Sequence, residues 1–134
     1  MQARPNVLII CDDDCTYRSL ETILEDCSNL TRVRDTENLE WQANRSSFDT
    51  VFCAWTFGAG SWMSILSFLR NRLPDAPVIV FNHSGGEEQW MEVLEAGGFD
   101  LLAAPYRKSN VVPLLEHAAS TYEARCLNRM AAAS

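Results

Sequence analysis

The sequence predicts an α/β fold in which a five-stranded parallel sheet lies between two layers of helices, a three-layer sandwich. Short apolar runs alternate with amphipathic helical patterns along the chain, five of each. The most apolar runs are continuous rather than alternating, as in strands that are covered on both faces. The length of 134 residues is that of one domain of this kind.

The five strands are predicted from short apolar runs. The first, third and fourth runs (NVLIIC, DTVFCAW and PVIVF) are almost wholly apolar, which indicates central strands. The second and fifth runs (LTRVRD and FDLLAA) are more mixed, which is typical of strands at a sheet edge. This distribution favours the strand order 2-1-3-4-5, known as flavodoxin-like. In chain order, the strands occupy residues 6–11, 30–35, 49–55, 77–81 and 99–104.

The five helices are predicted from apolar residues at helical spacing and from the signals at their ends. Ser61 is the candidate N-cap of the third helix, and Gly97 with Gly98 ends the fourth. Asn110 is the candidate N-cap of the last helix, which places Pro113 in its first turn. In chain order, the helices occupy residues 16–28, 37–45, 62–73, 87–96 and 110–125.

Composition and charge exclude several classes of function. One domain is predicted over residues 1–125, followed by a C-terminal tail over residues 126–134. The net charge is −7 and no Lys/Arg cluster offsets it, so direct nucleic-acid binding is not expected. No apolar run approaches the ~20 residues of a membrane span, and residues 1–5 lack the pattern of a signal peptide. With an odd number of cysteines, five, the sequence favours free thiols in a cytoplasmic protein.

The functional crevice of a parallel sheet with this strand order lies beyond the carboxyl ends of its strands. Asp12, Asp13 and Asp14 follow the first strand, and Asn82 and His83 follow the fourth. A flavin or nicotinamide nucleotide needs N–H donors and glycines around its phosphate, whereas adjacent carboxylates repel phosphate. The sequence therefore argues against FMN or NAD as a cofactor.

Two interpretations of the three aspartates stay open. Asp12 and Asp13 could bind Mg²⁺ weakly, because Mg²⁺ takes one or two protein carboxylates and keeps several waters. Alternatively, the aspartates form a solvated acidic loop that the dipole of the following helix favours. Cys11 and Cys15 flank them, but no nearby His or further Cys completes a zinc or redox motif, so structural cysteines are expected.

Four segments of the chain carry a resemblance to a known family: the strand that runs into the aspartates, FDTVFCAW, PVIVFN and EAGGFDLLAAPY. On these segments, residues 6–122 resemble the receiver domain of bacterial two-component response regulators. The spacing from Asn82 to Pro105 matches the family pattern without a gap. Asp12 and Asp13 match the acidic pair that holds Mg²⁺ in that family. The resemblance implies the same flavodoxin-like fold that the strand pattern predicts.

The resemblance also implies that most of the residues for receiver chemistry are missing. The aspartate that accepts the phosphoryl group in the family falls on Ala54, whose methyl group cannot form an acyl phosphate. The hydroxyl residue of the family falls on Asn82, the lysine on Ala104 and the aromatic switch residue on Leu101. The chain is therefore predicted to be a pseudo-receiver, a receiver fold that no longer carries out phosphoryl transfer.

The function that the resemblance implies is a signalling module of the two-component or phosphorelay class. Without the acceptor, it is expected to be non-enzymatic, independent of phosphorylation and active through protein–protein interaction. Receivers use the face of the fourth helix, fifth strand and fifth helix for dimerisation and output. The residues expected on this face, where a partner or a second copy would bind, are Trp90, Met91, Leu101 and Tyr106.

Other interpretations remain beside this one. Trp90 could be a core residue, although exposed Trp and Met are enriched at interfaces. The chain could be a phosphorelay receiver whose chemistry has moved to another acceptor. A third interpretation is a small flavodoxin-like enzyme or ligand-binding domain that uses the crevice around Asp12, Asn82 and His83.

Overall fold

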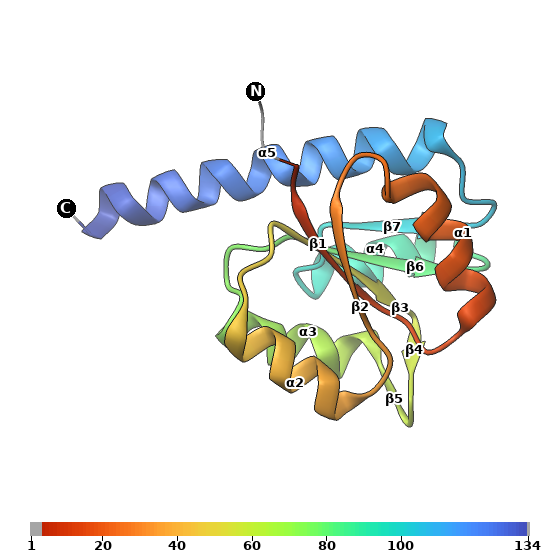
Figure 1. Ribbon diagram of the computed structural model, residues 1–134. Coiled ribbons are helices and arrows are strands. Elements are labelled where there is room, and N and C mark those ends of the chain that lie inside the picture. The colour runs from red at the N-terminus through yellow and green to blue at the C-terminus, as the bar shows by residue number, and fades with distance from the viewer. Residues whose placement is uncertain (1–3, 134) are drawn as a thin grey trace.

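One parallel sheet organises the fold of the computed structural model, which describes residues 4–133 (Figure 1). Its strands are β1 (Asn6–Ile10), β2 (Asn29–Val33), β3 (Thr50–Ala54), β6 (Val78–Asn82) and β7 (Asp100–Ala103). They lie in the order β2-β1-β3-β6-β7, and every neighbouring pair is parallel. The predicted order 2-1-3-4-5 is confirmed.

Five helices cover the two faces of the sheet (Figure 1). They are α1 (Asp14–Leu24), α2 (Thr36–Arg45), α3 (Trp62–Arg72), α4 (Glu87–Glu95) and α5 (Lys108–Ala133). The buried side chains of α1 and α5 pack on one face, and those of α2, α3 and α4 pack on the other. The predicted three-layer α/β architecture is confirmed.

The continuous apolar runs are explained by a core on each face. Along β1, Leu8 and Ile10 belong to one core cluster, whereas Val7 and Ile9 belong to the other. All four side chains are fully buried. Because successive side chains of a strand point to opposite faces, a strand covered on both sides needs apolar residues at every position.

A short hairpin between β3 and α3 was not predicted from the sequence. Its strands, β4 (Thr56–Phe57) and β5 (Gly60–Ser61), pair in antiparallel register. Gly58 turns the chain with φ +58°, a left-handed conformation that glycine adopts without a steric penalty. Phe57 is buried, so the hairpin folds back onto the core. Two-residue strands carry too few side chains for a period-2 pattern to be visible in a sequence.

The last helix differs from its prediction at both ends. It begins at Lys108, and Asn110 lies within its first turn rather than at the N-cap. From there, the Asn110 side-chain oxygen accepts the backbone N–H of Arg107 at 2.9 Å. Pro113 consequently lies inside the helix, not in its first turn.

The same helix runs to Ala133, well past the predicted end at Arg125, so the predicted tail is helical over residues 126–133. Arg129 explains part of this extension, because its guanidinium binds the carboxylate of Asp75 with N–O distances of 2.9–3.1 Å. Asp75 lies between α3 and β6, so the contact holds the distal half of α5 against the domain. No helix within residues 4–133 is long and apolar enough to cross a bilayer.

Candidate functional site

A cavity of about 150 Å³ lies at the carboxyl ends of β1, β3 and β6, where the strand order places the crevice. The crevice brings together Asp12, Asp13, Ala54, Asn82 and His83. Asp14, which was also expected there, is not among its lining residues. Neither Leu101 nor Ala104 is among its lining residues. The full lining is Cys11, Asp12, Asp13, Thr16, Ala54, Trp55, Thr56, Phe81, Asn82, His83 and Tyr106.

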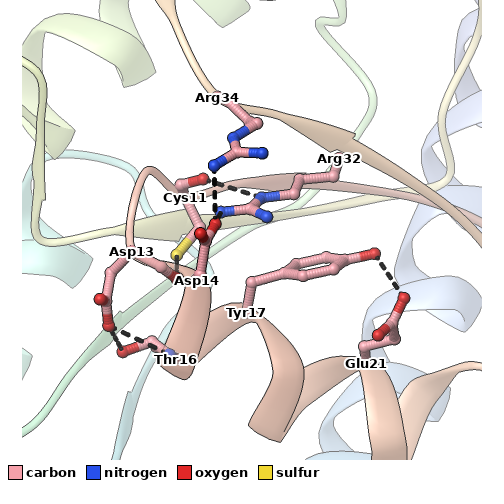
Figure 2. A network of polar contacts seen from close by, with 8 residues as sticks. All are labelled: Cys11, Asp13, Asp14, Thr16, Tyr17, Glu21, Arg32 and Arg34. Carbon is pink, nitrogen blue, oxygen red and sulfur yellow. Dashed lines mark hydrogen bonds and ion pairs between the residues drawn. The ribbon is translucent and has the colours of Figure 1, made fainter.

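Asp13 is the N-cap of α1, and its carboxylate turns back onto the helix (Figure 2). Its Oδ2 accepts the backbone N–H of Thr16 at 3.0 Å and also a hydrogen bond from the Thr16 hydroxyl. These two donors, the hydroxyl above all, lower the pKa of Asp13 below its usual value. The carboxylate therefore satisfies backbone and side-chain groups of its own helix.

Asp14 has a different pair of partners, Arg32 on β2 and Arg34 just after the end of that strand (Figure 2). Its Oδ1 lies 2.8 Å from a guanidinium nitrogen of Arg32 and 2.8 Å from one of Arg34. The hydrogen bond from Arg32, with the charge of Arg34, lowers the pKa of Asp14. Arg32 also covers the ring of Tyr17, with its guanidinium carbon 4.4 Å from the ring centroid.

The two arginines were missed by the sequence analysis, which treated LTRVRD only as a polar edge strand. Arg32 is paired in register with Ile9 on β1, and this pairing brings its side chain to the loop that follows β1. There its Nε donates to the carbonyl oxygen of Cys11 at 3.2 Å. A signal for this pairing was present in the sequence. In LTRVRD, arginines alternate with other residues, and the strand expected beside this segment runs into three aspartates.

Asp12 contacts the hairpin instead of a helix or an arginine. Its Oδ2 accepts the backbone N–H of Gly58 at 2.8 Å. This bond joins the loop after β1 to the tip of the β4–β5 hairpin, across one side of the crevice.

The crevice offers fewer free carboxylate oxygens than a tight Mg²⁺ site would need. Asp12 and Asp13 each use one carboxylate oxygen in the hydrogen bonds described above, and Ala54 offers a methyl group where a third carboxylate would be needed. Within the described part of the chain, no group of three or more His, Cys, Asp or Glu is arranged to hold a metal ion. Weak binding by the remaining oxygens stays a prediction.

The apolar side of the crevice contains Tyr106, which was expected on the interaction face. Its ring instead packs edge-on against Phe81, with centroids 6.1 Å apart. Its hydroxyl oxygen is buried and has no hydrogen-bond partner among residues 4–133. Burial raises the pKa of Tyr106 to about 12. Tyr106 therefore belongs to the crevice, and its assignment to the interaction face is corrected.

The three positions that match the switch residues of receivers have structural contacts here. Asn82 uses its side-chain oxygen to accept the backbone N–H of His83 at 3.0 Å. Leu101 packs against the core cluster under α4, while Ala104 contributes only a methyl group. A Cβ atom added to Gly85 would lie 2.9 Å from Leu101, so the loop after β6 approaches this side chain closely.

Trp90 and Met91 lie on the surface of α4 and are 41% and 44% exposed, so the interpretation of Trp90 as a core residue is wrong. The Trp90 indole N–H donates to Asp100 on β7 at 2.9 Å. Asp100 also accepts the backbone N–H of Leu101 at 2.8 Å. Trp62, in contrast, is 1% exposed and belongs to the core.

The cysteines have the surroundings of structural residues. All five thiols are free, and Cys11 and Cys53 are buried. Burial raises the pKa of both buried thiols, which disfavours the reactive thiolate.

Comparison with known proteins gives structural likeness without a close sequence relative. No protein-family model and no curated protein matches the chain. The structure of a protein described as adenylate cyclase from Rhodopirellula baltica matches with a TM-score of 0.87 and 13% identity, over 98% of this chain and 99% of that one. The beryllofluoride-activated NtrC4 receiver domain dimer matches with a TM-score of 0.78 and 20% identity, over 87% and 98%.

A third solved structure is the receiver domain of the Francisella response regulator 1452. It matches with a TM-score of 0.73 and 23% identity, over 90% of this chain and 98% of that one. Identities this low establish the fold alone. The chain therefore has the flavodoxin-like fold that is found in response-regulator receiver domains.

Proposed function

We propose that this chain is a receiver-type signalling module that acts by binding a protein partner, independently of phosphorylation. The observation that carries the proposal is Ala54 at the end of β3, inside the crevice. A phosphoryl group is accepted in receivers by an aspartate at this position, and a methyl group offers no nucleophile. The fold supports the module class, and the altered crevice supports its independence of phosphorylation.

The face of α4 and β7 supports the choice of interaction surface. Trp90, Met91 and Leu94 are 41%, 44% and 36% exposed and occupy neighbouring positions on α4. The bond from Trp90 to Asp100 fixes the indole ring before any partner arrives. A fixed aromatic side chain loses little conformational entropy on binding, which favours it as an interface anchor.

Phosphorylation is tested directly by incubating the protein with Mg²⁺ and acetyl phosphate and measuring its intact mass. We expect no change in mass. A stoichiometric, hydroxylamine-labile gain of one phosphoryl group would falsify the proposal, because it would show that another carboxylate accepts the group. The Ala54→Asp variant is treated in the same way as a positive control. If this variant becomes labelled, the phosphoryl donor and the mass measurement are shown to work.

A ligand-binding role for the crevice is the second candidate. It is favoured by the Tyr106 hydroxyl, which is buried at the cavity without a partner in the described residues. A ligand that accepts this hydrogen bond would satisfy a group that is costly to bury alone. In a thermal-shift screen, a ligand of this kind should stabilise the wild type more than Tyr106→Phe, whereas equal shifts would exclude the role assigned to the hydroxyl.

Cyclase activity is not assigned to the chain, although one structural neighbour is described as an adenylate cyclase. Asp12, Asp13 and Asp14 stand at the N-terminus of α1, where a nucleotide phosphate would need N–H donors. Their negative charges oppose a phosphate at that place.

A further inference from the structure

The exposed side of α4 combines an apolar centre with a rim of negative charge, and we call it the α4 face. Its centre consists of Trp90, Met91 and Leu94. Residues three and four positions apart are neighbours on a helix, so Trp90 and Met91 each lie one turn from a glutamate. The glutamates of the rim are all exposed: Glu87, Glu88, Glu92 and Glu95.

The negative charge of this face has no counter-charge in the part of the chain that the structure describes. α4 itself contains no Lys, Arg or His. The ion pairs among residues 4–133 join arginines to Asp14 and to Asp75, which lie elsewhere in the fold. Arg107 and Lys108, the first basic residues after α4, form none with its glutamates. The rim is therefore available to a cationic partner.

The glutamates also act against the helix that carries them. Glu92 and Glu95 lie in the last turn of α4, where the helix dipole disfavours negative charge and no basic residue compensates it. Glu88 and Glu92 are four positions apart, a like-charge spacing that destabilises a helix. Departures from local rules of this kind are typical of functional sites. A cation bound from outside would offset both costs.

The tryptophan at the centre lacks the cation that comparable rings have. Arg45 covers the exposed Trp41 of α2, with its guanidinium carbon 4.6 Å from the ring centroid. In the same way, Arg72 covers Phe68 of α3 at 4.8 Å. Trp90 is the other exposed tryptophan, and no guanidinium group among residues 4–133 lies over its ring. Guanidinium groups stack on aromatic faces, so this ring suits an arginine supplied by a partner.

We propose that the α4 face binds a basic protein segment in which apolar side chains are flanked by arginines. The proposal deepens the partner-binding role given above and rests on it. The apolar side chains of the segment cover Met91 and Leu94, while its arginines pair with the glutamates of the rim and stack on Trp90. A second copy of this chain is disfavoured as the occupant, because a twofold contact brings the same glutamates of both copies together.

The probe is a synthetic peptide of about 18 residues, five turns of helix, with leucine and arginine at helical spacing. Its binding to the full chain is measured by isothermal titration calorimetry, and a peptide with glutamate in place of arginine is the control. The double variant Glu88→Gln, Glu95→Gln removes two charges from α4. The double variant Glu37→Gln, Glu40→Gln removes the same charge from exposed positions of α2, which also carries an exposed tryptophan.

We expect the α4 double variant and Trp90→Ala each to raise the dissociation constant of the arginine peptide about fivefold or more. The α2 double variant should leave it within about twofold, because total charge alone does not create the site. The glutamate peptide should not bind. Raising the salt from about 0.1 M to about 1 M shortens the screening length from ~10 Å to ~3 Å and should weaken binding of the arginine peptide.

The proposal is overturned if the arginine peptide does not bind at concentrations up to about 1 mM, or if the α4 and α2 double variants lose affinity equally. It is also overturned if sedimentation equilibrium shows a wild-type dimer that Trp90→Ala dissociates, because a second copy would then occupy the face. Failure of the phosphorylation-independent role would appear separately, as phosphoryl labelling in the mass measurement. Thermal melts of each variant confirm that it is folded.

Discussion

At the scale of single residues, the three consecutive aspartates show how surroundings separate identical side chains. Asp13 caps α1, Asp14 pairs with Arg32 of β2 and with Arg34 just beyond it, and Asp12 holds the hairpin tip. The sequence placed all three at the crevice but gave no means of distinguishing them, because their partners are 3 to 46 positions away in the chain. The hydrogen bonds of Asp13 to its own helix are those of a capping residue, whereas weak Mg²⁺ binding by Asp12 and Asp13 stays a prediction.

The lowered pKa values of Asp13 and Asp14 predict how stability depends on pH. Their charged forms are favoured in the folded state, so their contribution is fully present above about pH 4, the unfolded value. It is lost as pH falls through the lower folded values. Asp13→Asn keeps a capping oxygen but removes the ionisation, so its free energy of unfolding should fall less between pH 5 and about pH 2 than that of the wild type.

Urea unfolding at a series of pH values measures this difference. Asp26→Asn is a control of the same chemistry, since Asp26 is exposed and lies beyond the end of α1. If the acid branch of Asp13→Asn is as steep as that of the wild type, the Thr16 bonds do not hold the carboxylate in its charged form.

The Ala54→Asp substitution should raise the affinity of the crevice for Mg²⁺. A third carboxylate would converge with Asp12 and Asp13 at the crevice, so Mg²⁺ should bind more tightly than to the wild type. The variant should not act as a phosphorylation switch, because Leu101 and Ala104 occupy the positions that match the aromatic and basic residues of receivers. Without metal, repulsion among the carboxylates should lower its stability. Calorimetric titration with Mg²⁺ tests this, with Ala54→Asn as the uncharged control; equal affinities would contradict the convergence of the three positions.

At the scale of elements, α4 is the clearest case of a helix with two tasks. Its residue Val93 is fully buried, while its residues Trp90 and Met91 are exposed. The sequence predicted Trp90 and Met91 on an interaction face, and both side chains are exposed. It could not show the bond to Asp100, because that bond depends on how α4 packs against β7.

Trp90→Ala should weaken partner binding or self-association through the α4 face and leave folding largely intact. A tryptophan at the centre of an interface contributes about 2 kcal/mol or more, which is about thirtyfold in affinity. Trp90→Phe keeps most of the apolar area but loses the N–H that bonds Asp100, so it should have an intermediate effect. Sedimentation and thermal melts of the same samples decide the matter. A large fall in melting temperature with unchanged association would contradict the interface role of Trp90.

Element boundaries show where sequence reasoning stops. The interiors of strands and helices were predicted because burial demands apolar residues at regular spacing. Polar contacts lie near both ends of α5, Asn110 with Arg107 at one end and Arg129 with Asp75 at the other. Asp75 is 54 positions from Arg129, and no local pattern reports a contact over that distance.

At the scale of the whole molecule, the fold was predictable because two independent features agree. The degree of apolarity distinguishes central strands from edge strands, and the alternation with helices requires parallel crossovers. The crevice followed from the strand order alone. The orientation of Tyr106 was not predictable, because a residue three positions after the end of β7 can turn either toward the crevice or toward the α4 face.

The sheet is shared by both core clusters, so the two faces should unfold as one unit. Leu115 on α5 is 2% exposed and packs on one face, whereas Trp62 on α3 is 1% exposed and packs on the other. Leu115→Ala should destabilise the domain by about 2–5 kcal/mol, the usual range for a leucine truncated in a core. Because β1 and β3 contribute side chains to both clusters, loss of packing at Leu115 should shift the unfolding transitions seen by tryptophan fluorescence and by far-UV circular dichroism to the same lower temperature.

Leu127→Ala, at a position that is 66% exposed, serves as the control and should change stability by less than about 0.5 kcal/mol at low protein concentration. Two separated transitions in Leu115→Ala would show that the α1–α5 layer unfolds independently of the α2–α3–α4 layer.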